Sequence, residues 1–308
     1  MNARFLGIEI GGTKLQCALG DGSGRIEQIE REQVNPEAGA AGIRRQIASA
    51  WQRLRARGRP AAVGVGFGGP VDWRAGRVIC SHHVPGWDGF PLGQWLEELV
   101  GAPAAVENDA NTAALAEALA GAGRDADPLF YVTMGSGVGG GLVAGGRVYH
   151  GAPPGEAEIG HVRLDREGTT VEARCSGWAT DRRVRRLAAE RPESALARRV
   201  AADPGREARH LLPALEEGDP NARKLIEETA SDLAFALSHV AHLFHPAAIV
   251  LGGGLSLIGE PLRAAVAKAL PDWLMKAFHP GPEIRLAELG EQAVPAGALI
   301  LAAQKAAG

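Results

Sequence analysis

A short acidic segment, VEND at residues 106–109, is the part of the sequence best suited to proton transfer. It ends an apolar run and precedes an alanine-rich stretch, which predicts a buried strand followed by a helix. Asp109 then lies where the strand ends at the mouth of a cleft, and its carboxylate can take a proton from a hydroxyl group. Asp or Asn in that place suits a helix N-cap equally well, so the segment alone leaves both roles open.

A second polar cluster, GEAEIGH at residues 155–161, combines acids with a histidine between glycines. Glu158 and His161 can hydrogen-bond a polar ligand from such a loop. A solvated loop with a hydrogen-bonded histidine is the commoner outcome for a stretch of this kind taken alone. Only other motifs can decide between a ligand-binding loop and a solvated one.

Three glycine-rich turns, at residues 11–13, 135–140 and 252–254, each follow a run that is typical of a buried strand. Because glycine lacks a Cβ, backbone N–H groups in such turns can converge on an anion, usually phosphate. One such turn is more often a plain hairpin, whereas three favour a nucleotide site. The second turn fits GxGxxG, but a strand follows it where the dinucleotide fingerprint requires a helix, and the chain has no P-loop motif.

The elements that must position these residues repeat one design. Residues 5–24 are typical of a strand, a glycine turn and a second strand, and residues 129–146 repeat that order. Two such hairpins, one in each half of the chain, suggest two related domains whose glycine turns face a shared cleft. Apolar periodicity predicts helices at about 41–57, 91–100, 110–120, 181–244 and 295–307, the fourth broken at Pro192, Pro204, Pro213 and Pro220.

The composition indicates an ordinary globular protein. The chain has 308 residues, of which 45% are apolar and 22% charged, enough for two packed domains. The net charge of -3 implies no basic face, so we expect no nucleic-acid partner. Cys17, Cys80 and Cys175 form no metal-binding or disulfide spacing, which indicates a reducing compartment. No apolar run approaches the roughly 20 residues of a membrane helix, so we expect no membrane partner and a cytoplasmic protein.

Eight motifs together resemble the ROK family of sugar kinases and repressors, within the hexokinase/actin-like superfamily. In chain order they are EIGGTK (9–14), GVGFGGPVD (64–72), PGWDGFPL (85–92), ENDANTAALAE (107–117), TMGSGVGGGLV (133–143), EIGH (158–161), VEARCSGWA (171–179) and IVLGGGLS (249–256). The resemblance implies an α/β, two-domain actin/hexokinase-like (ribonuclease H-like) fold with a nucleotide and sugar cleft between the domains. The implied small domain is 1–115, with helix 293–308 packing back on it, and the large domain is 116–292.

The resemblance also implies a role for each motif. The ATP-binding positions would be Glu9, Gly11, Gly12, Thr13 and Lys14, then Gly135, Ser136 and Gly137, and near the adenosine Gly252, Gly253 and Gly254. Glu9 stands where the family usually has Asp, and it would still hold a hydrated Mg²⁺. Asp109 would be the catalytic base, and the sugar-binding residues would be Gly69, Asn108, Asp109, Glu158, His161 and Glu172.

Besides Glu9, the chain departs from the family in two places. Many members carry CxCGxxGCxE after EIGH, with the histidine and three cysteines binding a structural zinc. Here VRLDREGTTV follows His161, without those cysteines, and Thr170 stands where the last one would be. Tetrahedral zinc needs four N or S ligands, so we predict no structural zinc. His83 also replaces the usual Asn.

The predicted function is therefore an ATP-dependent hexose kinase that transfers the γ-phosphate to a sugar, with the 6-hydroxyl of glucose favoured. Fructose, mannose and N-acetylhexosamines are the alternative substrates. A sugar-sensing regulator of the same family is disfavoured, because EIGGTK begins at residue 9 and leaves no room for a DNA-binding domain, and because both phosphate loops and Asp109 are intact. The family resemblance further implies a homodimer.

Overall fold

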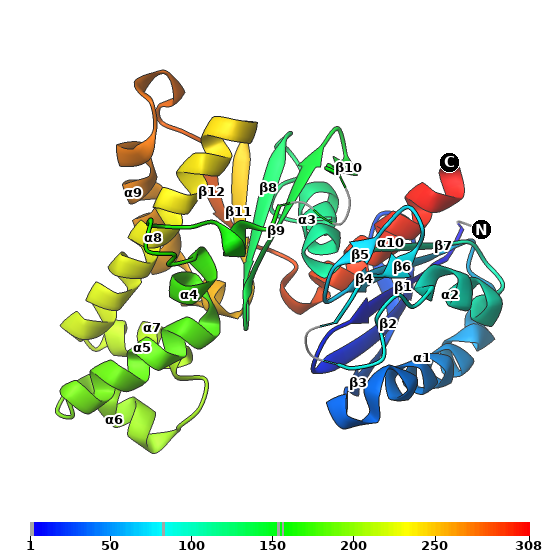
Figure 1. Cartoon of the computed structure of the whole chain (residues 1–308), viewed down its shortest axis with the longest axis horizontal. Helices are drawn as coiled ribbons and strands as arrows, with labels where there is room; N and C mark the ends of the chain where they lie inside the picture. The colour runs from blue at the N-terminus through cyan, green and yellow to red at the C-terminus, as the bar shows by residue number, and fades with distance from the viewer. Residues whose placement is uncertain (1–2, 82–83, 153–154, 156) are drawn as a thin grey trace. The chain divides into compact units, whose positions relative to one another are not determined.

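A computed structural model describes residues 3–81, 84–152, 155 and 157–308, so His83 and Glu156 lie outside the described residues. The chain divides into two compact units (Figure 1). Unit 1 consists of Met1–Asp125, Gly141–Glu156 and Leu289–Gly308, and unit 2 of Ala126–Gly140 and Ala157–Glu288. Each unit is described here by itself.

The five-stranded sheet of unit 1 has the order β3-β2-β1-β4-β7. Its strands are β1 (Phe5–Ile10), β2 (Lys14–Gly20), β3 (Ile26–Gln33), β4 (Val63–Phe67) and β7 (Ala104–Asn108). β1, β4 and β7 run parallel, with Ile10 opposite Phe67 and Phe67 opposite Asn108. The carboxyl ends of the three strands are therefore level, and the segments that follow them leave the same edge of the sheet.

Two pairs of helices cover the two faces of this sheet (Figure 1). α1 (Gly39–Leu54) and α2 (Leu92–Val100) pack in one apolar core with the face that carries Ile8 and Val65. α3 (Asp109–Ala120) and α10 (Ala293–Ala307) cover the other face. They approach the strands closely because that face carries glycine: a Cβ on Gly64 would lie 1.9 Å from the Ala298 carbonyl oxygen.

The smaller elements of unit 1 lie in its connections. They are η1 (Pro36–Ala38), η2 (Arg55–Arg57) and η8 (Gly290–Gln292), with the paired strands β5 (Val71–Asp72) and β6 (Arg77–Val78) and the strand β10 (Arg147–Val148). The helix predicted over 41–57 is thus an α-helix that begins two residues earlier and finishes as a 3₁₀ turn.

The second five-stranded sheet has the order β10-β9-β8-β11-β12, the same arrangement as the first. Its other strands are β8 (Leu129–Met134), β9 (Val138–Ala144), β11 (Ala248–Gly252) and β12 (Glu283–Leu286). β11 runs parallel to β8 with Gly252 opposite Thr133, so these two strands also end level. The hairpin design that the sequence repeats is therefore present once in each sheet.

The remaining elements of unit 2 are mostly helical. The helices are α4 (Val171–Cys175), α5 (Gly177–Glu190), α6 (Ala195–Ala202), α7 (Leu211–Glu216), α8 (Pro220–Phe244) and α9 (Glu260–Ala269), with 3₁₀ turns η3 (Ile159–His161), η4 (Glu207–His210), η5 (Gly254–Ile258), η6 (Leu270–Trp273) and η7 (Lys276–Phe278). The expected break at Pro213 is wrong, because this proline lies in the first turn of α7. Backbone N–H groups in the first turn of a helix make no hydrogen bond within the helix, so a proline, which lacks the N–H, is tolerated there. Pro220 instead begins α8 after the N-cap Asp219.

Among the described residues, no helix is both long and apolar enough to cross a membrane.

The close packing of α10 on β4 predicts that Gly64→Ala destabilises unit 1. The new Cβ meets backbone rather than a flexible side chain, so helix and sheet must move apart, at a cost of about 1–3 kcal/mol in unfolding free energy. Urea unfolding followed by circular dichroism measures this cost. Gly155→Ala is the matched control, because a Cβ there meets no atom within 4 Å. Equal midpoints for the two variants would contradict the packing.

Candidate functional site

Glu9 is a buried carboxylate beside the first glycine turn, in unit 1. The turn joins β1 to β2, and the Gly11 N–H donates to the Lys14 carbonyl at 3.0 Å. The Glu9 carboxylate lies 3.1 Å from the Lys14 ammonium and accepts a hydrogen bond from the Gln16 amide at 2.5 Å. Burial raises the pKa of Glu9, and the neighbouring Lys14 and Gln16 lower it by less. Thr13, at the tip of the turn, is exposed.

Asn108 and Asp109 lie at the level edge of the same sheet. The Asn108 side chain is the N-cap of α3, because its Oδ1 accepts from the backbone N–H of Ala110 at 2.8 Å. Its Nδ2 donates to the Gly69 carbonyl at 3.2 Å, which ties the strand end to the loop after β4. Asp109 is the first helical residue, and a Cβ on Gly68 would lie 3.4 Å from its Oδ2 and 3.6 Å from the Gly11 Cα.

Unit 1 thus brings three predicted motifs together. The Gly68 N–H donates to the Ile10 carbonyl at 2.8 Å, so the loop after β4 lies directly beside the strand that leads into the first glycine turn. Only a residue without a side chain leaves this space open next to the Asp109 carboxylate. A hydroxyl group that enters the space has a carboxylate and backbone groups within reach.

A further polar contact behind Asn108 was not predicted from the sequence. The buried Glu107 carboxylate meets the His150 ring at 2.5 Å and accepts from the Asn111 amide at 3.0 Å. The His150 ring stacks on Trp73 at 4.0 Å between centroids. A buried carboxylate such as Glu107 needs a hydrogen-bond partner, but nothing in the sequence indicates that this partner is His150, 43 positions away.

Unit 2 brings Glu172 to the second glycine turn. The Gly135 N–H donates to the Gly137 carbonyl at 2.9 Å, which closes the turn, and Ser136 at its tip is exposed. The Val138 N–H donates to Glu172 Oε2 at 3.0 Å. A Cβ on Gly135 would meet no atom within 4 Å, whereas one on Gly137 would lie 2.4 Å from Glu172 Oε2. Glu172, predicted to contact sugar, therefore also holds the turn.

The third glycine turn lies beside the second. A Cβ on Gly253 would lie 2.5 Å from the Met134 nitrogen, and Gly253 has a φ of 79°, a conformation that glycine adopts most readily. Gly252 is packed under the Tyr131 ring, whereas Gly254 is exposed with no atom within 4 Å of a Cβ. The open backbone at Gly135 and Gly254 leaves room for a ligand against this edge of unit 2.

Glu158 and His161 are both exposed; Glu158 precedes the turn η3, and His161 is its last residue. The His161 N–H donates to the Glu158 carbonyl at 3.0 Å, and Gly160 packs against the Val138 carbonyl. Backbone contacts therefore position this segment beside β9. The part of the chain that the structure describes gives the His161 ring no hydrogen-bond partner.

The residues around His161 do not fit zinc. Thr170 uses its hydroxyl to cap α4, accepting from the Ala173 N–H at 3.2 Å. Cys175 is buried, its Sγ donates to the Thr229 carbonyl at 3.8 Å, and burial raises the pKa of its thiol to about 12. Within the described residues, no group of three His, Cys, Asp or Glu side chains could hold a metal ion.

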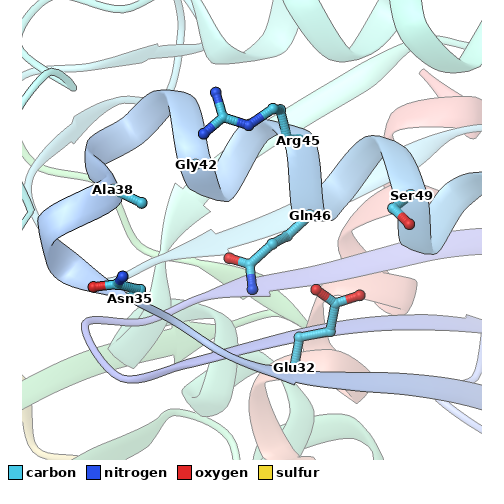
Figure 2. Close-up of a pocket in the computed structure, with 7 residues that line it drawn as sticks. All are labelled: Glu32, Asn35, Ala38, Gly42, Arg45, Gln46 and Ser49. Atoms are coloured by element: carbon cyan, nitrogen blue, oxygen red, sulfur yellow. The ribbon is translucent and has the colours of Figure 1, made fainter.

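A separate open pocket of about 400 Å³ lies between α1 and β3, over residues that the sequence did not single out (Figure 2). It is lined by Glu32, Asn35, Ala38, Gly42, Arg45, Gln46 and Ser49. None of these is a predicted site residue. We therefore place the candidate site at the sheet edges, where the motifs gather, and not at this pocket.

Comparison with known proteins identifies the family. The model of the ROK family matches residues 5–305. This chain belongs to the ROK family. It is 30% identical to a glucokinase of Thermotoga maritima, with 99% of each chain covered, and 33% identical to a kanosamine kinase of Amycolatopsis mediterranei, with 98% and 97% covered. The solved structure of a ROK glucokinase from Streptomyces griseus in complex with glucose and AMPPNP is 33% identical in sequence. The match covers 98% of this chain and 100% of that one, with a TM-score of 0.84.

These findings confirm the predicted ROK membership and the predicted α/β fold with two sheet-and-helix domains. The part of each predicted residue in binding or catalysis stays a prediction. The structure adds to it that the residues of unit 1 meet at one sheet edge and that those of unit 2 meet at another.

Asn108→Ala and Asp109→Asn separate capping from catalysis. Because Asn108 is the side-chain cap, its loss should lower the free energy of unfolding by about 1 kcal/mol. Asp109→Asn keeps the size of the side chain but cannot accept a proton, so kcat should fall by about two to four orders of magnitude with little change in stability. Thermal unfolding and steady-state kinetics measure the two effects. An Asp109→Asn variant with more than a tenth of wild-type turnover would contradict the assignment.

The side chains around His161 predict a protein without structural zinc. Elemental analysis of purified protein should find well under one zinc per chain, because the Thr170 hydroxyl caps α4 and the Cys175 Sγ donates to a carbonyl of α8. A chelator in the presence of excess magnesium should leave activity and melting temperature unchanged. Stoichiometric zinc, or unfolding by the chelator, would show that another ligand set exists.

Proposed function

We propose that this chain is an ATP-dependent hexose kinase that transfers the γ-phosphate of ATP to the 6-hydroxyl of glucose. The observation that carries the proposal is the level edge of unit 1, where Asp109 lies beside Gly68 and the first glycine turn. Relatives named glucokinase match nearly the whole chain at about 30% identity, and this confirms the predicted activity class, a sugar kinase.

Glucose is favoured over the other hexoses because of the relatives. Glucokinases from three genera match the chain at 30–32% identity, and the solved glucokinase complex holds glucose. A kanosamine kinase matches at 33%, so similarity of this degree also spans an amino sugar. Fructose, mannose and N-acetylhexosamines therefore belong in the substrate test, since discrimination depends on the partner of each sugar hydroxyl.

The proposed reaction needs little covalent chemistry from the protein. As the sugar hydroxyl oxygen bonds to the γ-phosphorus, the bond to the ADP oxygen breaks, and the hydroxyl proton passes to the Asp109 carboxylate. Asn108, fixed by the Gly69 carbonyl, orients the sugar, and Glu158, His161 and Glu172 supply further sugar contacts. N–H groups of the turns at 11–14 and 135–137 and backbone at 252–254 bind the nucleotide.

Magnesium fits the proposal as an ion carried by ATP. Carboxylate oxygen is the ligand that Mg²⁺ prefers, and Glu9 precedes the first glycine turn by one residue. Both Glu9 oxygens already accept from Lys14 and Gln16, so we propose that Glu9 contacts the ion through its bound water. Bound magnesium would neutralise negative charge on the phosphates during transfer.

Three further parts of the proposal concern the protein as a whole. We propose functional domains at 1–115 with 293–308 and at 116–292, a cytoplasmic location and a homodimer. The domain bounds and the homodimer follow the family resemblance, and the location follows the scattered cysteines of the sequence.

ATP turnover with a panel of hexoses tests the proposed function. ADP release should depend on sugar and magnesium, and glucose should give the highest kcat/KM. A different best hexose would replace glucose and leave the reaction class intact. An absence of sugar-dependent ADP release across the whole panel would contradict the kinase assignment.

The second glycine turn gives an independent test through Gly135→Val. A Cβ at this position would meet no atom within 4 Å, so the fold should tolerate the side chain, which would fill the space where a phosphate is proposed to lie. The affinity for ATP should fall at least about tenfold, while sugar affinity measured without nucleotide stays the same. Calorimetric titration gives both affinities. Equal losses for sugar and ATP would point to misfolding and leave the nucleotide role unsupported.

A further inference from the structure

The α4–α5 corner, defined here as residues 170–180, is a short structure with contacts on two sides. α4 has only five residues, and an isolated helix of that length is not stable in water. Local caps contribute: Thr170 caps α4, and Ser176 caps α5 by accepting from the Ala179 N–H at 3.1 Å. Contacts with the rest of unit 2 must supply the remaining stability.

One side of the corner sets the position of the second glycine turn. The Glu172 carboxylate accepts from the Val138 N–H at 3.0 Å, and the Gly177 N–H donates to the Gly135 carbonyl at 2.7 Å. Neither Gly137 nor Gly177 has room for a side chain, since a Cβ would lie 2.4 Å from Glu172 Oε2 or 2.7 Å from the Gly135 oxygen. Any shift of the corner therefore shifts the turn.

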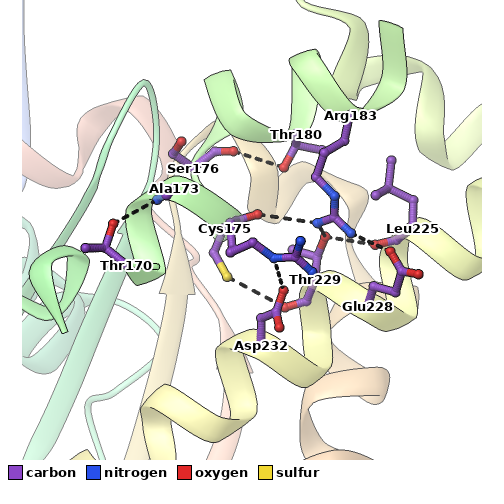
Figure 3. A network of polar contacts seen from close by, with 11 residues as sticks. Thr170, Ala173, Cys175, Ser176, Thr180, Arg183, Leu225, Glu228, Thr229 and Asp232 are labelled. Carbon is purple, nitrogen blue, oxygen red and sulfur yellow. Dashed lines mark hydrogen bonds and ion pairs between the residues drawn. The ribbon is translucent and has the colours of Figure 1, made fainter. Parts of the chain in front are cut away.

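The other side of the corner is fastened to the middle of α8 by two arginines (Figure 3). Arg174 Nε lies 2.7 Å from Asp232 Oδ2. Arg183, in α5, lies 2.6 Å from Glu228 and donates to the Thr229 hydroxyl at 3.1 Å. That hydroxyl donates in turn to the Leu225 carbonyl at 2.8 Å, so it both accepts and donates a hydrogen bond.

Exposed ion pairs contribute little, and the side chains of the Arg174–Asp232 pair are 39% and 25% exposed, so Arg183 is the more buried of the two arginines. The Arg183 side chain is only 11% exposed, and burial lowers the pKa of this guanidinium, so its partners offset a desolvation cost. The buried Cys175 Sγ also lies 3.8 Å from the Thr229 carbonyl, so one face of α8 meets the corner at several points.

We propose that Arg174, Arg183, Glu228, Thr229 and Asp232 are positioning residues that fasten the α4–α5 corner to α8 and thereby hold Glu172 and the second glycine turn in place. Ion pairs and hydrogen bonds supply this attachment. The kinetic consequence rests on the proposed kinase function, whereas the structural consequence does not.

Asp232→Asn tests the proposal because it removes the charge that pairs with Arg174 and keeps the size of the side chain. Asp232→Glu retains the carboxylate and serves as the conservative variant. Glu217→Gln is the matched control, since it breaks another arginine pair of unit 2, with Arg199 (Nε to Oε1 2.8 Å), that does not contact the corner. Arg174→Gln removes the same pair from the other side, should Asp232→Asn fail to fold.

We expect Asp232→Asn to raise the KM for ATP about tenfold with kcat changed by less than about threefold, while Asp232→Glu and Glu217→Gln stay near wild type. Hydrogen exchange should become faster in the peptide that contains the Val138 amide and in residues 171–177, with the melting temperature nearly unchanged. Unaltered exchange at Val138 in both Asp232→Asn and Arg174→Gln would overturn the proposal.

The exchange measurement keeps this proposal separate from the proposed function. If no hexose is phosphorylated by the wild-type protein, the kinase assignment fails and the exchange result still decides whether the corner is fastened as proposed. If the wild-type protein phosphorylates a hexose and the Val138 amide exchanges equally fast in Asp232→Asn and in the Glu217→Gln control, the kinase assignment stands and the positioning role is overturned.

Discussion

The register of three parallel strands is the constraint on which the candidate site depends. Ile10, Phe67 and Asn108 lie opposite one another, so the first glycine turn, the loop at Gly68 and the start of α3 emerge at one level. A slip of one residue in β7 would move Asp109 by about 3.3 Å along the strand and turn the neighbouring side chains to the other face. The position of Asp109, and with it the proposed proton transfer, therefore depends on the pairing along the whole length of β1, β4 and β7.

That register is kept by close packing of helices on the sheet. Gly64 and Gly66 allow α10 and α3 to approach β4, and Gly297 of α10 packs against the Thr112 carbonyl of α3 at a distance that excludes a Cβ. The last helix of the chain thereby fixes the helix whose first residue is Asp109. Glycine thus serves two purposes here: it leaves the backbone open at Gly135 and Gly254, and it allows close contact between helices.

The sequence predicted the parts of the site that are local in the chain. The turn at Gly11, the strand end at Asp109 and the turn at Gly135 are each recognisable from their neighbours. Which residue caps α3 was left open, because Asn108 and Asp109 are both good caps and only the backbone conformation decides. Contacts between distant residues were not predictable: Glu107 with His150, Glu172 with Val138, and Arg174 with Asp232 are far apart in sequence and carry no spacing signal.

Phosphorus NMR of the product formed from glucose and ATP labelled with ¹⁸O around the γ-phosphorus tests most directly that a sugar hydroxyl attacks this phosphorus. We predict glucose 6-phosphate in which the nonbridging phosphoryl oxygens carry the label and the oxygen that joins phosphorus to carbon 6 is unlabelled, because it comes from the sugar. A labelled bridging oxygen, or labelled inorganic phosphate without any sugar phosphate, would contradict the mechanism.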